Sequence, residues 1–132
     1  MSASAGPTPA PDRPPMILVT GAAGFIGSQV AKALLARGDA VLGLDNLNDY
    51  YDVALKQARL AALMDKPSFQ FRKLDISDRD AMLALAGEFP AISGIVHLAA
   101  QPGVRYSLIN PYAYIQANVM GHLVMLEMAR AL

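Results

Sequence analysis

The sequence contains no cysteine, and its charges cancel. Without cysteine there is no disulfide framework, no thiolate metal site and no cysteine nucleophile, and a reducing cytoplasm fits this composition. Eleven Lys and Arg side chains balance eleven Asp and Glu side chains, so no overall positive field attracts nucleic acid or an acidic membrane surface. We therefore expect a cytoplasmic protein without a nucleic-acid partner, in which any phosphate is bound by local geometry.

The sequence also lacks a long apolar run and a signal peptide. No stretch approaches the roughly 20 residues that cross a bilayer, so we expect no membrane partner. Residues 1–15 combine small residues with prolines in no periodic order, which predicts a disordered tail without a targeting signal. Of the 132 residues, 54% are hydrophobic, enough for the core of one domain, which we place at residues 16–132.

From residue 16 onward, short apolar runs alternate with longer helical patterns. The expected strands are residues 16–20, 40–45, 69–74 and 94–98, and the expected helices are residues 25–37, 53–64, 78–87 and a last one that follows a long loop and reaches residue 132. This alternation is typical of βαβ units around a parallel sheet. Because crossovers between parallel strands are right-handed, we predict the N-terminal portion of a Rossmann-type, doubly wound α/β sheet with strand order 3-2-1-4. The ligand crevice should lie at the carboxyl ends of strands one and four.

The helix patterns carry two more specific predictions. In the first helix, the apolar residues predicted to face the sheet are Ile26, Val30, Ala33 and Leu34, and Gly38 is placed to end that helix. Ser77 precedes the third helix and is predicted to be its N-cap.

A glycine-rich motif, Thr20-Gly-Ala-Ala-Gly-Phe-Ile-Gly27, joins the first strand to the first helix. In such a motif the first glycine permits a tight turn, the second lets the backbone approach a pyrophosphate, and the third lets helix and strand pack closely. Three glycines alone are weak evidence, but these follow an apolar strand and open a helical pattern, which is the context the motif requires. We predict a dinucleotide site here. The alternative is a turn with a purely structural role.

Asp45 ends the second strand, at about the distance from the glycines where an acidic residue meets the adenosine ribose. A carboxylate accepts hydrogen bonds from both ribose hydroxyls and repels a 2′-phosphate. The next residues, Asn46, Leu47 and Asn48, supply no arginine to bind such a phosphate, so NAD is favoured over NADP. The alternative is an exposed aspartate that only caps a turn or a helix.

Four motifs in this order resemble the extended short-chain dehydrogenase/reductase family, and within it the NAD-dependent epimerases and dehydratases: TGAAGFIG, the strand-ending Asp45, Leu74-Asp-Ile76 and His97-Leu-Ala-Ala-Gln101. The resemblance extends from Met16 to the C-terminus. It implies that Asp75 and Ile76 border the adenine, that residues 98–101 line the nicotinamide-side ribose, and that Asn118 lies near the cofactor. Taken alone, Asp75 would be a turn residue and Asn118 a polar helix residue. The predicted NAD-binding residues are Gly21, Gly24, Phe25, Ile26, Gly27, Asp45, Asn46, Asp75, Ile76, Leu98, Ala99, Ala100, Gln101 and Asn118.

Two loops narrow this resemblance to the UDP-glucuronate 4-epimerase branch. They are Asp45-Asn-Leu-Asn-Asp-Tyr-Tyr-Asp52 and Gly103-Val-Arg-Tyr-Ser107. The resemblance implies a UDP-sugar substrate bound by Gly103, Val104 and Arg105, where a guanidinium meets a carboxylate or phosphate with paired donors. It also implies a homodimer for the parent protein. The alternatives are an Arg105 that stabilises only its own loop, and another nucleotide-sugar epimerase, dehydratase or decarboxylase of the same fold.

The sequence has no Tyr-x-x-x-Lys pair. The epimerases it resembles use this pair with a Ser or Thr: a tyrosine of lowered pKa takes the sugar hydroxyl proton while NAD takes the hydride. None of the four lysines, Lys32, Lys56, Lys66 and Lys73, has a tyrosine four positions before it. We therefore expect no catalytic residue here, but an inactive fragment of an enzyme that works through a transient 4-keto sugar. A non-catalytic NAD-sensing module and an interaction remnant are the alternatives.

His97 is the one histidine in a predicted strand, and it has no His, Cys or acidic partner nearby in the sequence. A metal or catalytic role needs such partners, so we expect His97 to pack and expect no metal site.

Overall fold

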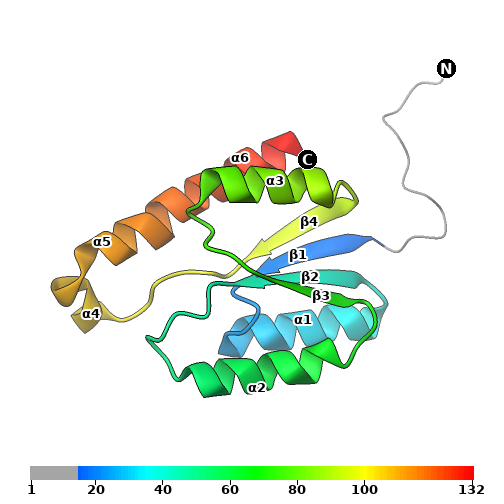
Figure 1. Ribbon diagram of the computed structural model, residues 1–132, viewed down its shortest axis with the longest axis horizontal. Coiled ribbons are helices and arrows are strands. Elements are labelled where there is room, and N and C mark those ends of the chain that lie inside the picture. The colour runs from blue at the N-terminus through cyan, green and yellow to red at the C-terminus, as the bar shows by residue number, and fades with distance from the viewer. Residues whose placement is uncertain (1–14) are drawn as a thin grey trace.

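A parallel sheet forms the centre of the computed structural model, which describes residues 15–132 (Figure 1). The strands are β1 (Met16–Thr20), β2 (Ala40–Asp45), β3 (Phe69–Lys73) and β4 (Ile92–His97). They pair in the order β3-β2-β1-β4, and each pairing is parallel. The predicted Rossmann-type sheet and its strand order are confirmed. The predicted tail lies outside the described residues, apart from Pro15.

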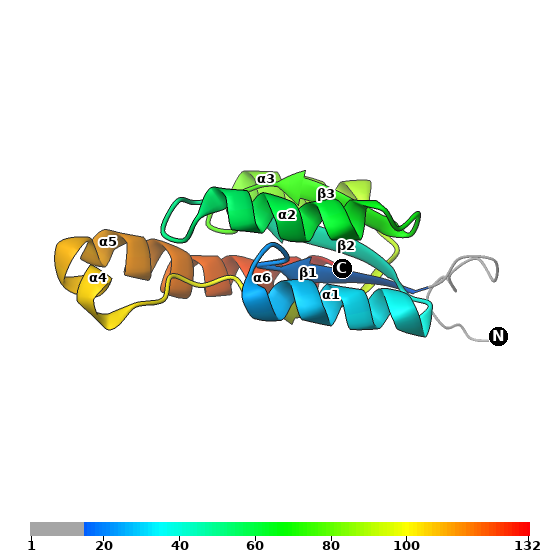
Figure 2. The same ribbon diagram turned by 90° about the horizontal axis from the view of Figure 1, so that it is seen from below.

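Helices cover both faces of the sheet (Figures 1 and 2). Helices α1 (Phe25–Arg37) and α2 (Val53–Met64) lie on one face, and α3 (Arg79–Glu88) and α6 (Gly121–Ala131) lie on the other. Because successive side chains of a strand point to opposite faces, neighbouring residues of β1 enter different cores. Leu18 packs toward α3 and α6, and Val19 packs toward α1 and α2. The two central strands β1 and β2 are thus buried on both faces, as their apolar runs require, whereas the edge strands β3 and β4 are only partly buried.

Three short helical segments extend beyond the carboxyl end of the sheet (Figures 1 and 2). They are α4 (Val104–Ile109), α5 (Pro111–Tyr114) and the π-helix η1 (Ile115–Met120), and they lead into α6. The prediction of a long loop before the last helix is wrong at α4, which forms within that loop. Pro111 is the first residue of α5, where its missing N–H has no helical partner to lose.

The side of α1 that faces the sheet differs from the prediction. The buried residues of this helix are Gly27, Ser28 and Ala31, whereas Ile26 is 64% exposed and Ala33 is exposed. The predicted apolar face is therefore wrong at these two positions. The physical reason is the close approach of α1 to the glycine loop, which only residues with small side chains allow.

The remaining differences lie at the ends of elements. The N-cap of α3 is Asp78, whose carboxylate accepts a hydrogen bond from the backbone N–H of Ala81 at 3.1 Å. The hydroxyl of Ser77 instead donates to Asp75 at 2.7 Å, so the prediction of a Ser77 cap is wrong. Strand β3 ends one residue before its predicted end, and β4 is shifted toward the N-terminus, within the usual uncertainty of element boundaries.

Candidate functional site

The glycine-rich motif forms a tight turn between the carboxyl end of β1 and the start of α1 (Figure 1). Gly21 has a φ of +72°, a conformation that side chains other than glycine's disfavour. Its N–H donates to the carbonyl of Leu44 at 2.8 Å, and a Cβ on Gly21 would lie 3.0 Å from the N–H nitrogen of Ala99. The turn is therefore held between the end of β2 and the segment that follows β4.

The two later glycines of the motif have different surroundings. A Cβ on Gly27 would lie 2.0 Å from the Gly21 carbonyl oxygen, so Gly27 allows α1 to pack against the turn. A Cβ on Gly24 would meet nothing within 4 Å except that same oxygen, at 3.1 Å. Gly24 is also the N-cap of α1, and it provides no side-chain hydrogen bond to the first turn. The first amides of α1 are thus free to bind an anion such as a phosphate.

Asp45 lies beside this turn and is buried, with 6% of its surface exposed. Its Oδ2 accepts a hydrogen bond from the N–H of Ala23 at 3.1 Å, and its Oδ1 accepts one from Leu47 at 2.8 Å. The Nζ of Lys56 lies 3.8 Å from Oδ1. A carboxylate offers about four lone-pair positions, so acceptor capacity remains for a further donor. The geometry differs from that of an exposed capping aspartate.

Two cations of α2 lie next to the turn, and the sequence analysis missed both. Lys56 is buried, and its Nζ donates to the Oδ1 of Asn48 at 3.2 Å. Arg59 donates to the carbonyl of Ala23 at 3.3 Å. The residues that follow Asp45 directly in the sequence include no cation, so the local sequence around Asp45 does not reveal these two. The spacing of Lys56 and Arg59 in the predicted helix indicates that both cations lie on one helix face, because residues three apart in a helix are neighbours on its surface.

Thr20 links the end of β1 to the end of β4. Its Oγ1 lies 2.7 Å from the Nδ1 of His97, and it accepts hydrogen bonds from the N–H groups of Leu98 at 3.0 Å and Ala99 at 3.1 Å. Since a hydroxyl has one donor and two acceptor positions, Thr20 donates to His97, and Nδ1 is the unprotonated nitrogen. The side chain of Thr20 thereby fixes the start of the segment predicted to line the nicotinamide-side ribose.

The environment of His97 favours its neutral form. Its ring centroid lies 5.6 Å from that of His122 on α6. Partial burial, and secondarily a positive charge on His122, lower the pKa of His97 from its usual 6.5. Within residues 15–132, no group of three or more His, Asp or Glu side chains is arranged to hold a metal ion.

Gln101 and Asn118 are joined by two reciprocal hydrogen bonds. The N–H of Gln101 donates to the Oδ1 of Asn118 at 2.7 Å, and the Nδ2 of Asn118 donates to the carbonyl of Gln101 at 3.1 Å. Asn118 belongs to the π-helix η1, and π-helical segments within α-helices occur frequently at functional sites. The structure thus brings the predicted residue Asn118 to the predicted segment 98–101.

Several predicted site residues lie apart from this arrangement. Asp75 is exposed, and its carboxylate accepts a hydrogen bond from the N–H of Ser77 at 2.9 Å. This is the geometry of a turn residue, the alternative role that the sequence allowed for Asp75. The side chain of Ile76 is buried in the core with α3 and α6. Phe25, by contrast, begins α1 directly after Gly24, and its exposed ring lies 5.9 Å from the guanidinium of Arg59. Val104 and Arg105 are exposed. Arg105 makes no hydrogen bond or ion pair within residues 15–132.

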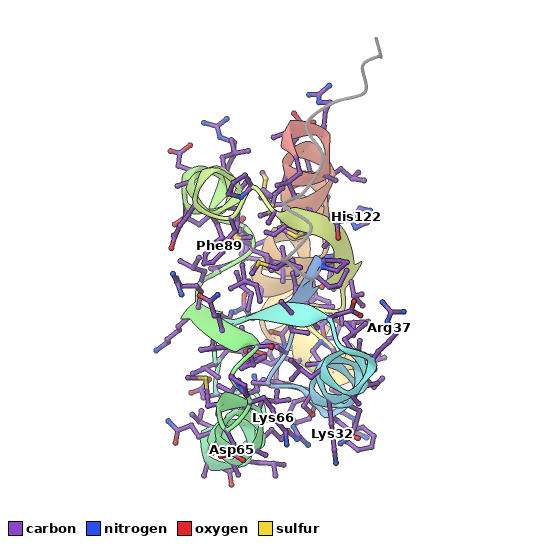
Figure 3. All side chains as sticks on the ribbon, turned by 90° about the vertical axis from the view of Figure 1, so that its right-hand side faces the viewer. Lys32, Arg37, Asp65, Lys66, Phe89 and His122 are labelled. Carbon is purple, nitrogen blue, oxygen red and sulfur yellow. The ribbon has the colours of Figure 1, made fainter. Side chains whose placement is uncertain are left out.

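A cavity of about 700 Å³ lies elsewhere, between α1 and α2. Its lining includes Lys32, Lys66 and Arg59, and Figure 3 shows the first two on the side of the sheet that α1 and α2 cover. Asp45 does not line this cavity, but Arg59 connects the cavity to the glycine turn through the carbonyl of Ala23. Among residues 15–132, no helix has the length and apolar character needed to cross a bilayer.

The chain is similar to a family of known proteins. Residues 18–132 match a family described as GDP-mannose 4,6 dehydratase. A UDP-glucuronate 4-epimerase of Thermodesulfobacterium geofontis is 48% identical over 113 residues, which cover 86% of this chain and 35% of the relative. UDP-glucuronate 4-epimerase 3 of Arabidopsis thaliana is 47% identical over 115 residues, covering 87% of this chain and 26% of the relative.

A solved structure with a similar fold is UDP-glucuronic acid 4-epimerase from Bacillus cereus, in complex with UDP-glucuronic acid and NAD. It superposes with a TM-score of 0.78 at 36% identity, over 89% of this chain and 37% of the solved chain. The chain spans about a third of the length of the bacterial relatives that it matches.

Proposed function

Because the chain belongs to the GDP-mannose 4,6 dehydratase family, we propose that residues 16–132 bind NAD and form the cofactor-binding part of a UDP-glucuronate 4-epimerase. The observation that carries the proposal is the buried Asp45 carboxylate, held against a glycine turn beside the uncapped start of α1. The N–H donors for a phosphate are thus adjacent to a carboxylate acceptor for the ribose hydroxyls, as a dinucleotide requires.

The residues around the turn fit the parts of NAD. The free amides of the first turn of α1, next to the open side of Gly24, would bind the pyrophosphate. Asp45 would accept hydrogen bonds from the ribose hydroxyls, and Lys56 would hold its carboxylate in place from the other side. NAD bound there would supply reversible hydride transfer for the sugar.

The segment after β4 would serve the nicotinamide side and the sugar. Thr20 holds the backbone of Leu98 and Ala99, and Asn118 holds the backbone of Gln101. Arg105, exposed and without a partner among residues 15–132, would meet the carboxylate or a phosphate of UDP-glucuronate with paired donors. Gly103 and Val104 would position that guanidinium.

The acid–base chemistry of the epimerisation is not carried by these 132 residues, since they hold no Tyr-x-x-x-Lys pair. The absence of this pair also favours one other function, that of a non-catalytic module that binds NAD. The two alternatives share the cofactor site and differ in whether Arg105 and its neighbours bind a UDP-sugar. Binding of UDP-glucuronate in the presence of NAD would favour the epimerase.

Isothermal titration with NAD and NADP tests the cofactor site. We expect tighter binding of NAD, and we expect Asp45→Asn to weaken it by roughly tenfold or more, because a hydrogen bond to a charged group contributes about 1.5–3 kcal/mol. Asp39→Asn is the matched control, since Asp39 is equally buried but precedes β2 at the opposite end, where it pairs with Arg37. Tighter binding of NADP, or equal losses in the two variants, would contradict the proposal.

A further inference from the structure

Four tyrosine side chains connect two loops at the carboxyl end of the sheet, and we refer to Tyr50, Tyr51, Tyr106 and Tyr114 as the tyrosine cluster. The ring centroids of Tyr50 and Tyr51 are 4.8 Å apart, those of Tyr50 and Tyr106 5.1 Å, and those of Tyr106 and Tyr114 6.3 Å. These separations are typical of attractive aromatic pairs. The cluster therefore joins the loop after β2 to helices α4 and α5.

Tyr50 and Tyr114 also contact the backbone just before α4. Gly103 has a φ of +99°, and a Cβ there would lie 2.0 Å from the hydroxyl oxygen of Tyr50. The tyrosine hydroxyl thus occupies the space of a side chain at position 103. The hydroxyl of Tyr114 donates to the carbonyl of Pro102 at 2.6 Å. The tyrosine cluster consequently holds both residues that precede Val104 and Arg105.

The loop that carries Tyr50 begins at Asp45. The Asp45 carboxylate accepts the N–H of Leu47, and Lys56 bridges Asp45 and Asn48. Asn48 in turn lies 3.5 Å from the side chain of Gln101. One short loop therefore contacts the carboxylate proposed to bind the ribose of NAD and also the segment that carries Arg105.

We propose that Tyr50 is a positioning residue, which couples NAD binding at Asp45 to the order of residues 102–106 and hence to the placement of Arg105 for the UDP-sugar. This rests on the proposed function. NAD bound to Asp45 restricts the loop, and Tyr50 transmits that restriction to Gly103 and Tyr106. A UDP-sugar that binds afterwards loses less conformational entropy, because residues 102–106 are already ordered. By linkage, the sugar nucleotide strengthens NAD binding by the same factor.

Hydrogen–deuterium exchange of the whole chain, with and without NAD, tests the coupling. In the wild type we expect NAD to slow exchange in residues 102–110. Tyr50→Leu removes the ring contacts but leaves Asp45 intact, so we expect NAD still to bind while the slowing is lost. Tyr50→Phe keeps the ring and should retain the slowing. Tyr112→Leu is the matched control, because Tyr112 lies in the same region, is 83% exposed and belongs to no ring pair, and it should behave as the wild type.

UDP-glucuronate affinity gives a second measurement of the same coupling. We expect saturating NAD to tighten UDP-glucuronate binding by about fivefold or more in the wild type, the lower end of typical coupling, and to have no such effect in Tyr50→Leu. Exchange in β1 and β2 reports whether each variant is folded.

The outcomes separate the two proposals. If Tyr50→Leu binds NAD and residues 102–110 are slowed as in the wild type, the coupling is wrong and the cofactor site stands. If Tyr50→Leu leaves exchange at 102–110 unchanged without NAD, the tyrosine does not hold this segment, and the coupling is again wrong. Failure of the wild type to bind NAD would overturn the proposed function and the coupling with it.

Discussion

At the scale of single residues, the Thr20 hydroxyl selects the tautomer of His97, with Nδ1 unprotonated. Because Thr20 accepts two backbone N–H groups, its proton is directed to Nδ1 of His97. A protonated His97 would present a second hydrogen to that hydroxyl and would place a positive charge beside the ring of His122. The hydrogen-bond geometry and the lowered pKa of His97 thus favour the same neutral state.

This state makes stability depend on pH. His97 binds a proton more readily in the unfolded chain, so between the usual pKa of 6.5 and the lower folded value the unfolded state carries more protons. Stability is therefore lost as the pH falls through this window. Urea unfolding at about pH 7.5 and about pH 5.5 measures the loss, and we expect it to be smaller in His97→Gln, which does not titrate. Equal losses in the two proteins would show that other groups cause the dependence.

At the scale of elements, the contact between α1 and the glycine turn decides how this helix lies on the sheet. Gly27 carries the contact, and the larger apolar residues Ile26 and Phe25 remain exposed. The amphipathic pattern of α1 is consequently a poor guide to its buried face. The same close approach brings the first amides of α1 to the carboxyl end of β1.

Alanine substitutions at two helical glycines should have opposite effects. Gly27→Ala would place its Cβ 2.0 Å from a backbone carbonyl oxygen, so we expect a loss of about 1–3 kcal/mol, typical of overpacking. Gly87→Ala, in α3, meets nothing within 4 Å and should stabilise the fold by up to about 1 kcal/mol through helix propensity. Chemical unfolding of both variants tests this. A Gly27→Ala variant as stable as the wild type would mean that α1 shifts at little cost.

At the scale of the whole molecule, the parallel direction of the strands brings the loops after β1, β2 and β4 to one end of the sheet (Figure 1). That end holds the glycine turn, Asp45, the Thr20 hydrogen bonds and the tyrosine cluster. The β1–β2 and β2–β3 connections cross one face of the sheet and the β3–β4 connection crosses the other, so the strand order reverses between β1 and β4, which is where open α/β sheets bind their ligands. Binding groups are thus concentrated there.

An assay of the 132 residues tests the division between binding and catalysis. With NAD and UDP-glucuronate, we expect no detectable epimerisation, because positioned acid–base groups alone typically contribute about 10²–10⁴ in rate and the Tyr-x-x-x-Lys pair is absent from this sequence. Product analysis by chromatography, with an active 4-epimerase assayed in parallel, provides the measurement. Turnover that copurifies with the chain would contradict this account and would direct the search to other proton acceptors.

Much of the fold follows from patterns that are local in the sequence. Strands β1 and β2 and helices α1 and α2 have their predicted bounds, and the glycine turn and Asp45 are adjacent as their spacing indicates. The family resemblance is confirmed by the match over residues 18–132. Hydrophobic periodicity, turn chemistry and the handedness of crossovers suffice for these features, since each depends on a few neighbouring residues or on a general rule of chain geometry.

Only the folded chain decides which distant residues complete the site. The bonds of Thr20 to His97 and of Asn118 to Gln101 join separate elements, as do the approach of Lys56 to Asp45 and the contact of Tyr50 with Tyr106. No local pattern predicts such pairs, because their energies depend on distances that exist only after the elements pack. The buried face of α1 has the same origin: the close contact of Gly27 with the turn outweighs the apolar pattern of the helix.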